Sequence, residues 1–106
     1  MKEADWKILS RLRPLAVERL YERIWQDILK KTALTDKDAR DRVQGVRDVA
    51  NKGDKLVAKV FDSTNFSRSN FSFHLYALVA EDLITDEELR QFSDEVQDRL
   101  KLWREG

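Results

Sequence analysis

Cysteine is absent from this chain of 106 residues, which also has one histidine, one proline and three glycines. The lack of thiols excludes disulfide bonds, thiolate nucleophiles and cysteine-ligated zinc or iron–sulfur centres. The small number of glycines and prolines, beside 42% apolar and 38% charged residues, is typical of a folded helical chain. Its length suits one domain, so we expect residues 1–106 to form a single helical domain.

Long apolar runs are also absent. No segment approaches the ~18 consecutive apolar residues of a membrane-spanning helix, and the first ten residues lack the apolar core of a secretion signal. We therefore expect a soluble, cytoplasmic protein with no membrane partner.

Neither sign of charge is in excess, because 20 basic and 20 acidic residues give a net charge of zero. The charges are unevenly distributed: residues 1–68 hold 16 basic and 11 acidic residues, whereas residues 69–106 hold 4 and 9. The two parts thus carry +5 and −5. This polarity favours packing of the two parts on each other, or contact between two copies, over a strongly anionic partner.

Strand signals are missing, since no segment shows sustained alternation of apolar and polar residues and no Asn-Gly or Asp-Gly turn occurs. The spacing predicts an all-α fold, a compact bundle of four to five helices. The first helical region covers residues 3–31 and contains Pro14. Because proline lacks an amide hydrogen and restricts the residue before it, we expect one helix to end near Leu12 and another to begin with Pro14. A single bent helix is the alternative.

The helix after Pro14 and the next helix both show regular apolar spacing. The positions on the first are Val17, Leu20, Tyr21, Ile24 and Ile28, which predict one buried side. The second helix is expected to begin after Thr35, as its cap, with Asp36 and Asp38 in the first turn. Its apolar and small positions step by four and three residues, as in a heptad repeat: Ala39, Val43, Val46, Ala50, Gly53, Val57 and Val60.

Gly53 leaves two interpretations open. Either it breaks the second helix into residues 36–51 and 54–62, because glycine weakens a helix interior by ~1 kcal/mol relative to alanine, or it lets another helix approach closely. A third helix is expected over residues 67–83, with Ser67 or Ser69 as its cap. Thr85 and Glu88 then form a capping box before the last helix, which has a possible restart at Ser93.

Catalytic and metal-binding patterns are not evident. His74 lies among apolar neighbours and is best explained as a structural histidine, hydrogen-bonded at the edge of the core. The acidic clusters lack the spacing and the turn glycine of a calcium loop and the Glu-x-x-His pairs of di-iron bundles. We therefore expect no enzyme activity, no metal and no cofactor.

Nucleic-acid binding is the alternative function, because basic residues are frequent in the second helical region. The candidate contacts are Arg40, Arg47 and Lys55. Aspartates at several neighbouring positions cancel most of the positive field that phosphate contacts need. A regulator associated with nucleic acid is therefore kept as the second hypothesis.

The stretch STNFSRSNFSFHLY, residues 63–76, has aromatic residues among Ser, Asn and Arg. We interpret Phe71 and Tyr76 as lying near the buried side of the third helix, and Phe66 as a hydrophobic staple at its start. Phe73 and Arg68 remain as candidates for a binding surface. In one version of that surface, Ser67, Arg68 and Ser69 capture an anion at a helix N-terminus.

Three tryptophans, Trp6, Trp25 and Trp103, are many large rings for a small core. All three could be core residues, but Trp25 lies at the margin of its apolar stripe, where interface anchors are often found. The first hypothesis is therefore a non-catalytic module that binds a protein partner or a second copy of itself, in the latter case as a homodimer. Its candidate interface residues are Trp25, Arg68 and Phe73.

Three segments resemble those of small, functionally uncharacterised helical proteins of bacteria: DWKILSRLRPLAVERLYERI, VFDSTNFSRSNFSFHLYAL and LITDEELRQFSDEVQ. The resemblance covers most of the chain in order. It implies an all-helical bacterial protein of unassigned role, and it transfers no functional residue.

Overall fold

The structure is a computed structural model that describes residues 1–105. Its elements are α1 (Glu3–Thr32), α2 (Ala39–Val57) with a π-helical end, η1 (Ala58–Asp62), the 3₁₀ turn η2 (Arg68–Asn70), α3 (Phe71–Ala80), α4 (Asp86–Leu89) and α5 (Asp94–Glu105). The all-α class and the expected number of helices are confirmed, and the described residues contain no strand.

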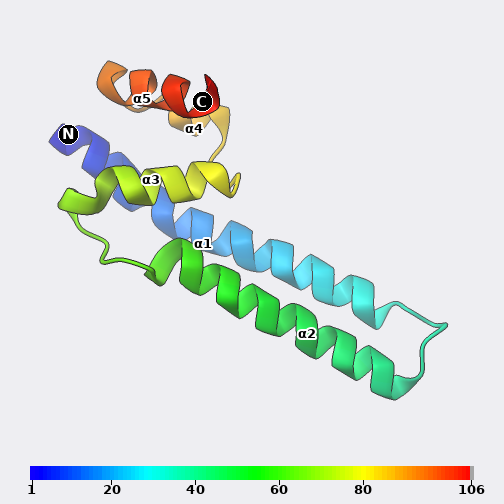
Figure 1. The fold of residues 1–106 in the computed structure, drawn as a ribbon. Coiled ribbons are helices and arrows are strands. Elements are labelled where there is room, and N and C mark those ends of the chain that lie inside the picture. Colours follow the sequence, from blue (N-terminus) through cyan, green and yellow to red (C-terminus); the bar gives the residue numbers. More distant parts are fainter. Residues whose placement is uncertain (106) are drawn as a thin grey trace.

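The molecule is elongated. Its radius of gyration is 17.0 Å and its extents are 54 × 25 × 25 Å, whereas a spherical domain of this length has a radius of gyration of about 13 Å. Figure 1 shows the reason: α3, α4 and α5 gather around the first half of α1, while the rest of α1 and α2 project as a hairpin. We call these parts the head and the arm, and the arm comprises residues 21–57.

The core lies in the head. Helix α1 contributes a buried stripe of Leu9, Leu12, Ala16 and Leu20. The other buried apolar residues come from η1, α3 and the C-terminal segments: Val60, Phe61, Phe71, Leu75, Leu78, Leu83, Ile84, Leu89, Phe92, Val96 and Leu100. Burial of such side chains stabilises a fold by about 1.5–3 kcal/mol each. The head therefore holds almost all of the hydrophobic stabilisation.

The expected helix end near Leu12 is wrong, because α1 runs without interruption through Pro14 for 30 residues. Pro14 itself is exposed, and the buried positions Leu12 and Ala16 on either side of it belong to the same stripe. Packing of that stripe outweighs the hydrogen bond that proline removes, a loss of about 3 kcal/mol in an exposed helix.

Three helix ends also differ from expectation. Asp38, not Thr35, caps α2 by accepting a hydrogen bond from the Asp41 amide at 2.8 Å. Neither Ser67 nor Ser69 caps the third helix, because their hydroxyl groups bond to each other at 3.0 Å. Helix α3 stops at Ala80 rather than Leu83, since Asp82 takes a left-handed conformation with φ 57° that closes the C-terminus.

The C-terminal part agrees with the sequence pattern. Thr85 and Glu88 form the reciprocal capping box at the start of α4. The chain restarts at Ser93, whose amide and hydroxyl donate to the two carboxylate oxygens of Asp5 at 2.8 and 2.6 Å. Because Asp5 is only 1% exposed, this buried contact ties the start of α5 to the start of α1.

Gly53 allows α1 and α2 to approach closely, and α2 is continuous through it. A Cβ atom at Gly53 would lie 2.8 Å from Cδ1 and 2.9 Å from Cγ2 of Ile24. A Cβ at Gly45, by contrast, would meet only the aliphatic chain of Lys31, at 3.5 Å or more. The two glycines therefore have different roles in the same helix.

We expect the substitutions Gly53→Ala and Gly45→Ala to have opposite effects on stability. Alanine favours a helix by about 1 kcal/mol, but overpacking against Ile24 costs about 1–3 kcal/mol. Gly45→Ala should therefore raise the free energy of unfolding by about 0.5–1 kcal/mol, and Gly53→Ala should lower it by about 1 kcal/mol. Urea titrations followed by circular dichroism measure both values.

The background variant Ile24→Ala is the control, because it removes the three atoms that a Cβ at Gly53 would meet. In that background Gly53→Ala should become stabilising. Equal stabilisation by both glycine substitutions in the unaltered chain would contradict the close approach.

Candidate functional site

The arm has almost no core of its own. Among residues 21–57 only Gly53 is fully buried, whereas Ile24 and Ile28 are half-buried. Figure 1 shows no other helix over the outer part of the arm. Two helices that pack only on each other leave apolar residues in contact with water. The arm is therefore a candidate interaction surface.

One side of the arm is apolar. Tyr21, Trp25 and Leu29 follow each other at four-residue steps on α1 and are 47%, 52% and 38% exposed. Val43, on α2, is 58% exposed. Half-buried apolar residues lie between these positions: Ile28, Val46, Ala50 and Val57. We call these eight residues the apolar face, and none of them is charged.

Helical spacing and a shallow hollow place the two halves of the apolar face on the same side of the arm. The hollow, of about 350 Å³, is lined by Thr32 of α1 and by Ala39, Arg42, Val43 and Val46 of α2. On α1, Ile28, Trp25 and Tyr21 precede Thr32 by four, seven and eleven residues, respectively. These spacings put all four residues on the same side of the helix. The face therefore continues from one helix to the other.

The three predicted interface residues do not form one surface. Arg23 of α1 donates to Glu81 at the end of α3, at 3.0 Å, and Trp25 lies about 200° further round the helix. Trp25 consequently points away from α3, which carries Phe73. The interpretation that all three tryptophans are core residues is wrong for Trp25, while Trp6 and Trp103 are half-buried.

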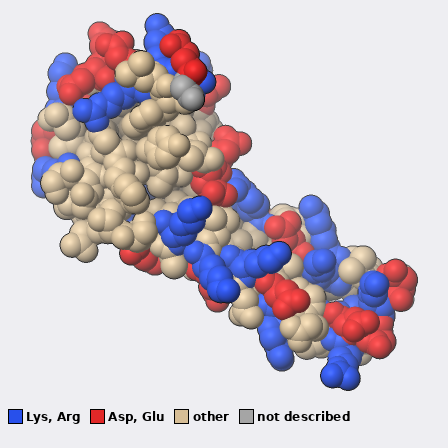
Figure 2. All heavy atoms as spheres, viewed as in Figure 1, with Lys and Arg blue, Asp and Glu red and all other residues tan. Residues whose placement is uncertain are grey.

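Phe73 belongs to a second apolar region, on the head. Figure 2 shows an uncharged area over α3, a helix that contains no charged residue. Phe73 and Tyr76 are each 50% exposed there, and Tyr76 stacks edge-on against Trp103 at 5.2 Å. The expectation that Tyr76 lies on the buried side is therefore wrong, whereas Phe71 is buried as expected. Phe66 packs against Trp6 at the start of this segment.

Arg68 is occupied by an ion pair. Its guanidinium donates two hydrogen bonds to the Glu3 carboxylate, at 2.6 and 3.0 Å, and lies over the ring of Trp6. These hydrogen bonds hold the pKa of Glu3 below its ordinary value and raise the pKa of Arg68. An anion captured by Arg68 would have to displace Glu3, so the geometry offers no support for that version of the surface.

The candidate nucleic-acid contacts Arg40, Arg47 and Lys55 are all exposed on α2. Arg40 and Arg47 are seven residues apart and share one side, but Lys55 lies about 80° away from Arg47. Acidic residues alternate with them, and Asp48 accepts a hydrogen bond from Gln44. The nucleic-acid hypothesis stays a prediction without a geometric feature in its favour.

His74 is a buried structural residue, as expected from its neighbours. It is 3% exposed, its Nε2 atom lies 2.8 Å from the carbonyl oxygen of Asn65, and its ring contacts Phe66 and Phe73 edge-on. Within residues 1–105 no group of three or more histidine, aspartate or glutamate side chains is placed to hold a metal ion.

Two arginines of α1, on either side of the point where the arm begins, bind the C-terminal part of the head. Arg19 donates to both oxygens of Glu88, at 2.7 and 2.9 Å, and to the carbonyl oxygen of Leu83. One turn further, Arg23 donates to the side chain and the carbonyl oxygen of Glu81. The hydrogen bonds from Arg19, supported by Thr85, lower the pKa of Glu88 to about 2. The capping-box glutamate thus has a second role that sequence spacing did not indicate.

Sequence reasoning missed most of the apolar face. The spacing places Tyr21 on the buried side of its helix and Val43 in the heptad pattern of the next one, and it predicts neither as a surface contact. The width of the apolar stripe on α1 indicates that some of its residues are exposed. The stripe covers about half of the helix circumference and consists of Leu20, Tyr21, Ile24, Trp25, Ile28 and Leu29. One neighbouring helix cannot cover so wide a stripe.

Comparisons with protein-family models, with curated proteins and with solved structures find no match for this chain. The resemblance to uncharacterised bacterial helical proteins therefore stays a prediction. None of the helices within residues 1–105 combines the length and the apolar character required to cross a membrane.

We expect Glu88→Gln to weaken the fold in a pH-dependent way. The pKa of Glu88 is depressed in the folded state, so its contribution is present above about pH 4.5 and is lost as the pH falls towards about 2. Because the side chain of Arg19 is 37% exposed, solvent screens the pair, and we expect a loss of about 1 kcal/mol at pH 7. Urea unfolding at pH 7 and near pH 2 measures the difference from the unaltered chain.

Glu87→Gln is the matched control, because Glu87 occupies the same helical turn and is exposed. It should change the free energy of unfolding by less than about 0.5 kcal/mol at either pH. A loss for Glu88→Gln that persists undiminished near pH 2 would assign the effect to the capping hydrogen bonds instead of the ion pair.

Proposed function

We propose that this chain is a non-catalytic self-association module, and that two copies pair through the apolar face of the arm to form a four-helix bundle. The observation that carries the proposal is the continuous run of exposed apolar side chains on an arm with almost no core of its own. The cytoplasmic location and the bacterial source inferred from the sequence stay predictions alongside it.

A second copy suits the apolar face because the face is uncharged. In a symmetric dimer the same patch of each subunit contacts its counterpart, so a charged patch would bring like charges together. The eight residues of the apolar face avoid that repulsion. Two helical hairpins packed face to face also give the common four-helix arrangement, in which each apolar side is covered by two helices.

Side-chain size on the two helices is complementary. Tyr21, Trp25 and Leu29 on α1 are large, whereas Val43, Val46 and Ala50 on α2 are small. Ile24 lies opposite Gly53, and Lys31 lies opposite Gly45. Because the helices are antiparallel, Trp25 and Ala50 lie at nearly the same level along the axis of the arm. A two-fold axis parallel to the arm then places α1 of one copy over α2 of the other, with the large side chains on the small ones.

The area of the face indicates which class of interface it can form. From Val43 to Val57 the face is about 21 Å long, and two packed helices are about 18 Å wide. The projected area is therefore on the order of 400 Å² per copy, or about 800 Å² in total, which is below the size of stable interfaces and in the range of weak, transient ones. We expect a reversible dimer with a micromolar dissociation constant rather than an obligate one.

The head surface around Phe73 is the competing candidate, since it is exposed to the same degree as Trp25. Its rings are already partly packed: Tyr76 contacts Trp103, and Phe73 contacts His74. The helices of the head have a complete core, whereas those of the arm do not. Pairing through the arm therefore removes more apolar surface from water than pairing through the head would. Burial of apolar surface is the dominant favourable contribution to association.

Trp25→Glu and Phe73→Glu form a matched pair that separates the two surfaces. Sedimentation equilibrium of the full chain should show dimers forming over about 1–100 µM, and Trp25→Glu should remove them by placing a desolvated carboxylate in the interface. Phe73→Glu should leave the association unchanged. Circular dichroism checks that both variants stay helical, which their exposed positions favour.

Salt provides an independent check, because an apolar interface should dissociate no more readily at high ionic strength. A monomer at all concentrations, or loss of the dimer in Phe73→Glu but not in Trp25→Glu, would exclude pairing through the apolar face.

A further inference from the structure

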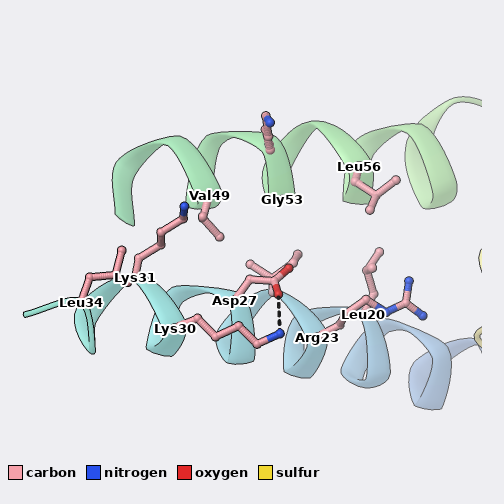
Figure 3. Close-up of a pocket in the computed structure, with 11 residues that line it drawn as sticks. Leu20, Arg23, Asp27, Lys30, Lys31, Leu34, Val49, Gly53 and Leu56 are labelled. Atoms are coloured by element: carbon pink, nitrogen blue, oxygen red, sulfur yellow. Dashed lines mark ion pairs between the residues drawn. The ribbon is translucent and has the colours of Figure 1, made fainter. Parts of the chain in front are cut away.

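The arm has a groove on the side opposite the apolar face. It has a volume of about 450 Å³, and its floor consists of apolar side chains from both helices: Leu20, Ile24, Leu34, Val49 and Leu56. Figure 3 shows Leu20, Val49 and Leu56 pointing into the space between α1 and α2, with Gly53 on the α2 side of the groove. The groove and the apolar face are therefore the two open sides of one hairpin.

Basic residues are among those that line the groove. Lys30 and Lys31 come from α1 and Lys52 from α2, while Asp27 is the one acidic lining residue. Asp27 is paired with Lys30 at 3.8 Å, and both side chains are more than half exposed, so this pair is weak. Within residues 1–105 neither Lys31 nor Lys52 has an acidic residue in ion-pair distance.

The end of the groove nearest the head is closed by Arg23. This residue lines the groove but directs its guanidinium to Glu81 and Asp82. The groove is thus bounded by the head at one end and extends towards Lys31 and Leu34, near the tip of the arm. Eleven residues separate Leu20 from Lys31, which corresponds to about 16 Å, or three turns of helix.

We propose that this groove, which we call the basic groove, binds an amphipathic α-helix of a partner protein whose apolar stripe is flanked by carboxylates. A space between two antiparallel helices is the place where a third helix packs, with its ridges in the groove that the first two leave. The floor supplies contacts for apolar side chains spaced by three and four residues. Lys31, whose aliphatic chain crosses from α1 to Gly45 of α2, and Lys52 of α2 supply the charge complementarity.

A second copy of this chain does not fit the basic groove. A symmetric contact through it would bring the lysines of both copies together, which is unfavourable. An acyl chain with a carboxylate is also a poor match, because small ligands are held in sites that enclose most of their surface, and this groove is open along its length. The inference is independent of the proposed dimer, which uses the other side of the arm.

The test uses a labelled synthetic peptide of about sixteen residues, with leucines at i, i+3, i+4 and i+7 and glutamates beside them. A second peptide with lysines in place of the glutamates is its control. Fluorescence anisotropy with the full chain should detect binding of the glutamate peptide, and the lysine peptide should bind at least about tenfold more weakly. Added salt should weaken the glutamate peptide's binding.

Charge reversal locates the binding site. Lys52→Glu and Lys31→Glu should each weaken binding of the glutamate peptide by about tenfold, whereas Arg47→Glu should change it by less than about twofold, because Arg47 does not line the groove. Lys52 and Arg47 are both exposed cations of α2, which makes them a matched pair. Circular dichroism verifies that each variant is folded.

Several results would overturn the inference. Equal binding of the two peptides, or an equal effect of Arg47→Glu and Lys52→Glu, would show that no charge-selective helix site exists in the groove. Binding of dodecanoate that depends on Lys31 and Lys52, without binding of the glutamate peptide, would make the groove a site for acyl anions. Trp25→Glu should leave peptide binding intact. The proposal of a dimer and the proposal of a peptide site in the groove are therefore tested separately.

Discussion

Two helices that pack only against each other bury a single narrow strip between them, and the rest of their side chains remain in water. In this protein the limit applies to residues 21–57, where the one fully buried residue is a glycine. The arm is held because α1 is anchored in the head, where Arg19 binds Leu83 and Glu88, and because Arg23 of the arm binds Glu81. Its position is therefore determined by the head, and its open sides are available for other molecules.

The two sides of the arm differ in the kind of partner that they suit. The apolar face consists of uncharged residues, so it can meet its own copy without repulsion. The basic groove is lined by apolar residues and by lysines of both helices, so it suits a partner of opposite charge. Figure 2 shows the charged side chains distributed along the visible side of the arm, in contrast to the uncharged surface of the head over α3. One hairpin can thus serve two separate contacts.

The sequence was most informative where local chemistry determines the structure. The capping box at Thr85, the restart at Ser93 and the burial of His74 follow from short-range patterns, and the structure contains all three. The helix break at Pro14 was wrong because the buried stripe on both sides of it is a property of the tertiary fold. No local pattern indicates that Leu12 and Ala16 pack into the same core.

The candidate site was predicted only in part, for a related reason. Trp25 stood out by its place at the edge of a stripe, but Tyr21 and Tyr76 have the same apolar spacing as buried residues and are exposed. Helical periodicity identifies which residues share a side, and it does not identify which sides another helix covers. The elongated shape, which leaves the arm uncovered, follows from the lengths and the crossing of the helices.

The continuity of α1 has a mechanical consequence. One helix of 30 residues forms part of the core and also one half of the arm, so no flexible joint separates the two regions. A change in the direction of the arm would therefore act on the contacts that Asp5 and Arg19 make with Ser93 and Glu88. Because residues 3–20 of α1 pack in the head and residues 21–32 form half of the arm, the direction of the arm is fixed by the packing of the core.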